Sequence, residues 1–172
     1  MENSVSLLAS SIMSHFPSTM TGIAIILAII TTTWFKHDRA CSDIFLSRLM
    51  FFAVGLTGLW GFILNLFFQN IAAQYVGWSP SPFQFEVAVA NLGLGIAGIC
   101  GVCASRDYRV ATTIFTTCFL WGTAAGHIRE MMTTHNFALG HAGMIFYNNL
   151  IVPLLLIVFL CCQTCCKSNK VP

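Results

Sequence analysis

The chain has 172 residues, of which 56% are hydrophobic and only 8% are charged, and its formal net charge is +2. A soluble domain carries about 25% charged residues, so this composition excludes a water-soluble globule, and the small net charge gives no indication of a nucleic-acid partner. Because apolar stretches of about 17–25 residues cross a bilayer as helices, we expect an all-α, polytopic transmembrane helix bundle in contact with the lipid bilayer.

Five apolar segments follow one another along the chain and predict about five membrane-spanning helices. Residues 1–18 contain no Lys or Arg, so the positively charged region of a cleaved signal peptide is missing, and we expect the first helix to be retained. No stretch between the segments is long enough to fold alone, so we treat residues 1–172 as a single integral-membrane domain. The predicted spans are residues 19–35, 49–68, 82–104, 110–128 and 144–162.

The positive residues predict the orientation of the chain. Seven of the eight Lys and Arg residues fall on one side of a five-span arrangement, and only Arg129 falls on the other. Since positively charged loops face the cytoplasm, we expect the N-terminus outside and the C-terminus inside, in the inner (plasma) membrane.

Most of the eight cysteines map to the same inner side, which is reducing, so disulfides are not expected there. Cys100 and Cys103 form a C-x-x-C pair, and four more cysteines lie within residues 161–166. Such groups suit a zinc or redox site. They equally suit polarizable filling inside one helix and an apolar or palmitoylated end of another, and we favour this second interpretation.

Small residues at spacings of four predict where the helices pack, because helices in lipid associate through close backbone approach. The third predicted helix carries such a stripe from Gly93 to Ser105, and the fourth carries one from Cys118 through Gly122 to Gly126. We therefore expect a tight bundle built on the second, third and fourth helices.

An ionisable residue, Glu86, stands near the start of the third predicted helix, where Ser81, Pro82 and Gln84 form the pattern of a capping box. The positive end of the helix dipole favours its charge, and an ionisable residue that faces the interior of a bundle is a functional candidate. Four helices bring polar residues to this same outer level, whereas their inner halves are almost entirely apolar. The candidate ligand-binding residues are Asn65, Glu86, Asn91, His127, His135, Asn136, His141 and Asn149.

Three histidines, His127, His135 and His141, belong to this outer layer. Their spacings match no recognised pattern of metal ligands, so we predict no metal site. We expect His127 to be hydrogen-bonded to Glu86 or to a backbone carbonyl, and a histidine at this surface can respond to external pH.

Three motifs in the chain are specific enough for a comparison: GWSPSPFQFEVAVANLG (residues 77–93), LWGTAAGHIREMMTTHNFALGHAG (120–143) and FYNNLIVP (146–153). In this order they resemble the signatures of an uncharacterised bacterial and archaeal family of integral-membrane proteins, a domain of unknown function. The resemblance covers most of the chain and implies a compact protein with five spans.

The resemblance implies no activity, but it marks certain residues as pattern positions. Asn149 stands where the pattern often has Asp, and His141 stands where it usually has Asn, which counts against carrying over a titrating mechanism. The candidate residues that match the pattern are Glu86, His127, His135 and Asn136.

Three functions are consistent with these features. The first is an outer-facing polar pocket, with Glu86 and His127 at its core, that binds or moves a small solute, a proton or a lipid headgroup. The second is a structural or accessory subunit that forms a homo-oligomer or docks on another membrane protein through its glycine faces. The third is a membrane enzyme that uses Glu86 and His127 as an acid–base pair on a lipid or quinone. The chain has no nucleophile motif and no cofactor fingerprint, so we assign no catalytic residue, leave any cofactor unknown and rank the enzyme last.

Overall fold

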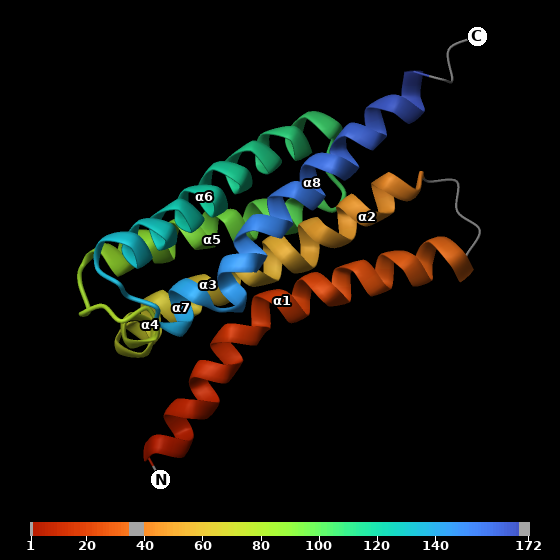
Figure 1. Ribbon diagram of the computed structural model, residues 1–172. Helices are drawn as coiled ribbons and strands as arrows, with labels where there is room; N and C mark the ends of the chain where they lie inside the picture. Colours follow the sequence, from red (N-terminus) through yellow and green to blue (C-terminus); the bar gives the residue numbers. More distant parts are fainter. Residues whose placement is uncertain (1, 35–39, 169–172) are drawn as a thin grey trace.

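The computed structural model describes residues 2–34 and 40–168, and within them the side chains of residues 11, 12, 14–34 and 40–163. All regular secondary structure in these residues is helical (Figure 1), which confirms the predicted all-α class. The elements in chain order are α1 (Glu2–Trp34), α2 (Cys41–Leu49), the π-helix η1 (Met50–Leu56), α3 (Thr57–Phe67), α4 (Gln69–Tyr75), α5 (Phe83–Gly101), α6 (Arg106–Thr133), α7 (Leu139–Ala142) and α8 (Met144–Ser168).

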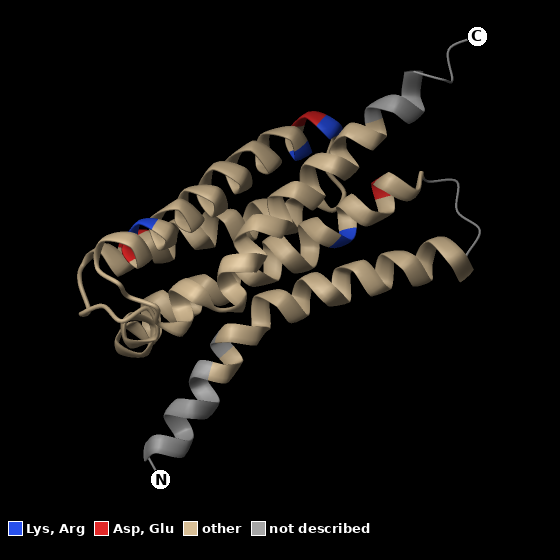
Figure 2. Ribbon diagram, viewed as in Figure 1, with Lys and Arg blue, Asp and Glu red and all other residues tan. Residues whose placement is uncertain are grey.

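The long helices α1, α5, α6 and α8 and the continuous rod α2–η1–α3 lie side by side in one bundle (Figure 1). The short helices α4 and α7 lie at one end, which we call the α4/α7 end, and the opposite end, where α2 begins, is the α2 end. Helix α5 runs from the α4/α7 end to the α2 end, α6 returns, and α8 starts again beside α7. The charged residues of the described chain lie toward the two ends, with uncharged helix between them (Figure 2).

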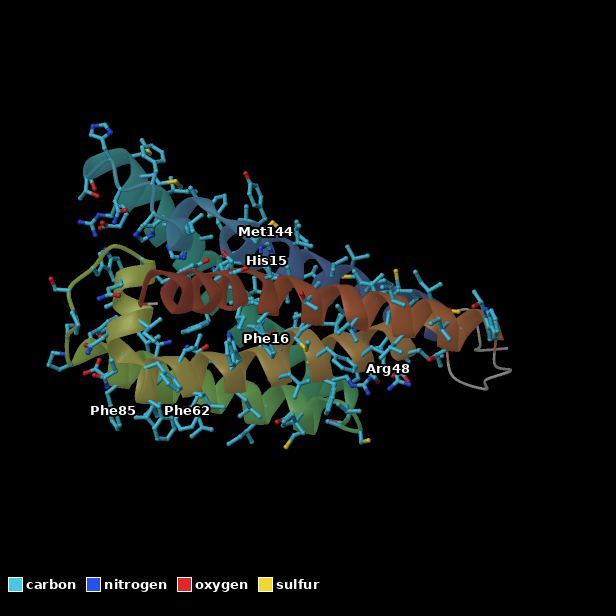
Figure 3. All side chains as sticks on the ribbon, turned by 90° about the horizontal axis from the view of Figure 1, so that it is seen from below. His15, Phe16, Arg48, Phe62, Phe85 and Met144 are labelled. Carbon is cyan, nitrogen blue, oxygen red and sulfur yellow. The ribbon has the colours of Figure 1, made fainter. Side chains whose placement is uncertain are left out.

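Four helical segments are long and apolar enough to cross a membrane, which makes the chain a multi-pass membrane protein with lipid contact. Large apolar side chains face outward on them, among them Ile26, Phe85 and Val158, which are 57%, 55% and 53% exposed; Figure 3 shows Phe85 and Phe62 along one edge of the bundle. The four candidate spans are Ser14–Trp34, Cys41–Phe67, Phe83–Gly101 and Leu139–Gln163.

The remaining predicted span, residues 110–128, lies within the 28-residue helix α6. It differs from the other four because threonines and His127 interrupt its apolar residues, and it is not among the candidate spans of the described chain. By length and composition, therefore, four of the five predicted spans stand, and α6 is a long helix of mixed character beside them.

The tightest packing lies between the η1–α3 rod and α5. A Cβ atom added to Gly58 would lie 2.6 Å from the backbone nitrogen of Gly95, and one added to Gly98 would lie 2.5 Å from the backbone nitrogen of Gly55. Backbones this close leave room for glycine alone. The second and third predicted helices thus pack tightly, as expected.

The predicted small-residue stripes are wrong in their details. Gly93, Gly122 and Gly126 have no neighbouring atom within 4 Å of an added Cβ, so these glycines lie on open faces, and among the glycines of these two stripes only Gly101 contacts a neighbour, the side chain of Met50. The glycines expected on the second helix, Gly58 and Gly61, do lie against α5. Spacing shows which residues share a face of a helix, but packing of the whole bundle decides which face turns inward.

The inward faces of α5 and α6 differ in chemistry. The buried residues of α5 are Ala88, Leu94, Gly95, Gly98 and Gly101, none of which has a polar side chain. The buried residues of α6 are Arg109, Thr112, Thr113, Thr116, Ala124 and His127. Helix α6 therefore presents an almost wholly polar face to the bundle, beside an apolar core that contains Leu49, Met50, Val152 and Leu156.

Candidate functional site

Buried polar side chains gather at the α4/α7 end of the bundle, and they come from helices far apart in the sequence. Each is less than 9% exposed, and a polar group buried this deeply needs a hydrogen-bond partner to be stable. The buried polar residues at this end are Ser14 and Thr21 of α1, His127 of α6, His141 of α7, and Asn148 and Asn149 of α8.

The centre of this group is a contact between two histidine rings, His127 and His141. Their Nδ1 atoms lie 2.7 Å apart, and the rings meet at 61°. His127 is 7% exposed and His141 is fully buried. A hydrogen bond between two ring nitrogens needs one N–H and one bare nitrogen, so the pair holds a single proton between its Nδ1 atoms.

The far side of the His141 ring has no protein partner in the described chain. Its Nε2 atom is buried and makes no hydrogen bond, although an imidazole has a donor or an acceptor at each nitrogen. The Trp78 ring lies beside it, with ring centroids 5.5 Å apart. The Trp78 Nε1 donates to Glu130 Oε2 at 3.4 Å, which places a carboxylate one helical turn beyond His127 in the same group.

Local hydrogen bonds hold α7, and with it His141, in place. The His141 backbone N–H donates to the carbonyl of Ala138 at 2.8 Å. The Tyr75 hydroxyl donates to the carbonyl of Leu139 at 3.3 Å and lies 2.6 Å from the Ser14 hydroxyl. This chain of contacts ties α7 to α4 and to α1, so a helix of four residues is fixed by its neighbours.

A hydrogen bond between Thr21 and Asn148 joins α1 to α8 at this end. The Thr21 hydroxyl lies 2.8 Å from Asn148 Oδ1, to which it can donate, and 3.0 Å from the Pro17 carbonyl of its own helix. Asn149, the next residue and a predicted site residue, is 6% exposed and lies on the same buried face of α8.

Asn136, another predicted site residue, has a structural part in the loop between α6 and α7. Its Nδ2 donates to the Val76 carbonyl at 3.0 Å, and its Oδ1 accepts from the Ala138 N–H at 3.1 Å. The side chain lies against Gly77, whose φ of +70° suits glycine. Asn136 therefore fastens the two loops that lie around Trp78 and His141.

Glu86 lies apart from this group in the structure. It is exposed in the first turn of α5, and no hydrogen bond or ion pair to another described residue is present. The expected hydrogen bond between Glu86 and His127 is not formed, because His127 has turned to His141. Half of the predicted capping box is present, since the Ser81 N–H donates to Gln84 Oε1 at 3.1 Å, although α5 begins one residue later than expected, at Phe83.

The other predicted residues occupy two kinds of position. Asn65 and Asn91 are half-buried and donate to carbonyls four residues earlier, those of Gly61 and Val87, which is a local use of the amide in a helix. His135 is exposed, with a positive φ of 53° that ends α6. These three residues are not brought to the histidine pair.

The cysteines of the described chain show no grouping. Cys41, Cys100, Cys103, Cys118, Cys161 and Cys162 are exposed and free, and Cys165 and Cys166 lie outside the described side chains. No cluster of three or more His, Cys, Asp or Glu residues that suits a metal ion occurs in the described part of the chain.

Sequence reasoning missed a buried ion pair at the α2 end. Arg109 of α6 is 3% exposed and donates to Asp43 Oδ1 of α2 at 2.5 Å, to Gly101 and Val102 carbonyls at the end of α5, both at 2.7 Å, and to Ser47 at 3.0 Å. Gln163 of α8 donates to the same Asp43 oxygen at 2.9 Å. The signal that the sequence offers for it is Arg109 itself, an arginine close to a helix start in a chain with few charges.

Comparisons with known proteins add a family but no precedent for an activity. A family model described as "Family of unknown function (DUF6790)" matches residues 14–169. No curated protein matches the chain, and no solved structure matches it. Any function has to be argued from the geometry.

Proposed function

We propose a function from the site itself, because the chain belongs to the DUF6790 family, whose function is unknown. We infer that this is a five-span protein of the inner (plasma) membrane that binds a proton in the His127–His141 pair near the outer surface. The observation that carries the proposal is the 2.7 Å contact between two buried Nδ1 atoms, beside a buried Nε2 atom without a protein partner.

The path of the chain supports five crossings. Helix α5 ends at the α2 end, and α8 begins at the α4/α7 end, so α6 must return along the bundle between them (Figure 1). Its 28 residues extend about 42 Å at 1.5 Å per residue, which exceeds the roughly 30 Å of a hydrocarbon core. The buried residues of α6 are mostly polar, and apolar residues such as Ile114, Phe115 and Trp121 are exposed on its outer side.

The positive residues support the orientation. In the described chain Arg48 lies in α2, Arg106 and Arg109 lie in the first turn of α6 at the α2 end, and Arg129 lies near the other end of α6. Figure 2 shows positive residues toward both ends. The positive-inside rule then puts the α2 end in the cytoplasm. The histidine pair accordingly lies near the outer surface.

The hydrogen bond between the two rings depends on how many protons the pair carries. Neutral rings share one N–H between two nitrogens, whereas two cationic rings would place two N–H groups face to face and break the bond. The nearby titratable groups are Glu130, bonded to Trp78, and Tyr75, bonded to the Leu139 carbonyl. Acid on the outer side is therefore expected to separate α7 from α6. His141 of α7 is the residue that completes this pair.

The test is nitrogen NMR of histidine-labelled, full-length protein in lipid nanodiscs. At neutral pH we expect a coupling between the two Nδ1 nuclei across the hydrogen bond, and we expect it to vanish when both rings are protonated. His141→Gln should remove it, whereas the exposed control His135→Gln and the variant Glu86→Gln should leave it unchanged. Two rings that show no coupling at any pH would refute the pair, and a loss in Glu86→Gln would restore Glu86 to the core of the site.

A second function, the accessory subunit, is favoured by one specific observation. The face of α6 that carries Cys118, Gly122 and Gly126 is exposed, with nothing near either glycine. A second copy or another membrane helix can approach such a face closely. If it does, Gly122→Leu should dissociate a complex isolated in mild detergent, and unchanged size on gel filtration would count against a partner at this face.

A further inference from the structure

The buried face of α6 continues the polar character of the histidine pair along the length of the bundle. Five of its six buried residues are polar. From Arg109 to His127 they extend over 18 residues, which is about 27 Å at 1.5 Å per residue and close to the roughly 30 Å of a hydrocarbon core. We call this face, together with the residues of α8 opposite it, the α6 seam.

The threonines of the seam divide into two pairs. The hydroxyls of Thr112 and Thr116 donate to the carbonyls of Tyr108 and Thr112, four residues earlier, at 3.0 and 2.8 Å. A threonine hydroxyl inside a membrane helix usually makes its hydrogen bond in this way. The hydroxyls of Thr113 and Thr117, one turn apart on the adjacent line of the helix, are buried and make no hydrogen bond with the described protein.

Two contacts show how α8 lies beside α6. Trp121 Nε1 lies 3.4 Å from the Leu150 carbonyl, and Arg109 and Gln163 bind the same oxygen of Asp43. These contacts set an antiparallel register in which Asn149 lies at a level between His127 and Thr117. At the α2 end, Gln163 Oε1 is another buried atom without a partner.

Buried polar atoms without protein partners are where internal water is found, because water supplies the missing hydrogen bonds. In order along the seam these atoms are His141 Nε2, Thr117 Oγ1, Thr113 Oγ1 and Gln163 Oε1. They lie at the two ends of the seam and at two consecutive turns of α6 between them, and all are buried. Two other such atoms of the described chain, Ser42 Oγ and Trp60 Nε1, belong to α2 and α3.

We propose that the unpartnered polar atoms of the α6 seam line a hydrated path that carries protons between the two membrane surfaces. The hydroxyls of Thr112 and Thr116, which are bonded to their own helix, take no part in it. The inference rests on the proposed function, since the histidine pair is the outer end of the path. A proton that binds His127 shifts the shared proton onto Nδ1 of His141, and His141 then releases the proton of its Nε2 atom to water in the seam. The proton passes along water and the hydroxyls of Thr117 and Thr113, and one proton leaves at the α2 end, so that nothing is oxidised or reduced.

The two ends of the seam suit this role. The Asp43 side chain is 25% exposed and offers a carboxylate in contact with water at the α2 end, while the side chain of its partner Arg109 is buried and disfavours the entry of metal cations. Phe119 and Leu120 pack against the apolar core between the levels of Thr117 and Asn149. They form the driest part of the path, where apolar side chains can gate by excluding water.

The experiment measures proton flux into liposomes that contain the full-length protein, a trapped pH-sensitive dye and a potassium diffusion potential. We expect a flux well above that of protein-free vesicles. Thr113→Val with Thr117→Val should lower it about tenfold, which corresponds to about 1.4 kcal/mol of barrier. The matched control, Thr112→Val with Thr116→Val, should keep the wild-type flux because those hydroxyls are bonded to their own helix.

The serine versions, Thr113→Ser with Thr117→Ser, keep both hydroxyls and should restore the flux, which separates a lost path from a misfolded protein. Wild-type vesicles no leakier than empty ones, or equal losses in the two valine pairs, would overturn the path. The NMR coupling of the histidine pair is measured independently. A coupled pair without flux refutes the path alone, and flux without coupling refutes the pair.

Discussion

Helices α5 and α6 both lie within the bundle, yet they bury opposite kinds of surface. Helix α5 turns Gly95 and Gly98 to the η1–α3 rod, so closely that a Cβ would contact backbone. Helix α6 turns threonines, an arginine and a histidine inward, and its own Gly122 and Gly126 outward.

The difference separates two tasks in a small membrane protein. Close glycine contact between backbones excludes water and makes a rigid unit, and that unit holds no polar site. Buried polar groups cost free energy unless they are hydrogen-bonded. We therefore expect a long buried polar face, such as that of α6, to bind internal water or protons. If this comparison is right, changes to α5 should affect folding, whereas changes to the middle of α6 should affect transport.

The largest expected effect comes from Arg109→Ala, at the end of the polar face. The variant removes the bonds from one buried guanidinium to Asp43, Ser47 and two carbonyls at the end of α5. Breaking a buried pair by removing one partner costs about 3–5 kcal/mol. We expect that loss in the free energy of unfolding, measured by denaturant titration in detergent micelles.

The control for Arg109 is Arg48→Ala, which removes an exposed arginine from the same end (Figure 3) and should change the free energy of unfolding little. If both arginine variants lose the same small amount, the pair does not anchor α6. The polar face would then be a solvent-exposed surface rather than part of the bundle.

The features of the structure that follow from composition were predicted correctly. The features that depend on how each helix is rotated about its own axis, such as which glycines of α5 and α6 face inward, were not. Long apolar stretches are a property of the chain itself, so the helical class and four candidate spans followed from them. Whether Gly93 or Gly95 faces inward depends on how α5 is rotated about its axis, which spacing does not determine.

The candidate site shows the same division. The gathering of polar residues at one end follows from where the helices begin and end. The sequence therefore predicts His127, His141 and Asn149 as members of one polar layer. The partner of His127 depends on α7, a four-residue helix held by Tyr75 and by the loop at Asn136. No local pattern predicts such a contact, and the Nδ1 atom of His127 lies against His141, whereas the sequence favours Glu86 or a backbone carbonyl as its partner.

The next effect in size concerns the glycine contact. Gly58→Ala places a Cβ atom 2.6 Å from the backbone nitrogen of Gly95, and overpacking of this kind costs about 1–3 kcal/mol. Gly93→Ala, on the open face of α5, should instead stabilise the helix by about 0.5–1 kcal/mol. Thermal unfolding in micelles compares the two, and equal melting temperatures would show that α3 and α5 do not touch as closely as described.

A smaller effect is expected from Tyr75→Phe at the α4/α7 end. The phenol donates to the Leu139 carbonyl and contacts Ser14, so its removal should cost about 1–2 kcal/mol. Burial raises the pKa of Tyr75 above its ordinary value of 10, so the native chain keeps a proton that the unfolded chain loses. Stability from this group is present below pH 10 and lost as pH rises above it.

The comparison for Tyr75 is Tyr147→Phe, since Tyr147 is 54% exposed. Unfolding measured from pH 8 to 11 should show a shallower alkaline loss in Tyr75→Phe than in wild type, and no change in Tyr147→Phe. Identical alkaline slopes for all three proteins would mean that the phenol does not hold α7 against α1.

The smallest effect is the most informative about α6, because its sign matters more than its size. A buried hydroxyl with no partner is unfavourable, so in a dry seam Thr113→Val should stabilise the protein. A hydroxyl bonded to internal water contributes about 0.5–1.5 kcal/mol, so in a hydrated seam the same change should destabilise it by about that amount. Thr116→Val, whose hydroxyl bonds to its own helix, serves as the reference in the same denaturant titration. We expect Thr113→Val to lose stability relative to Thr116→Val. A gain would mean that the polar face of α6 is as dry as the glycine face of α5, and a dry face carries no protons.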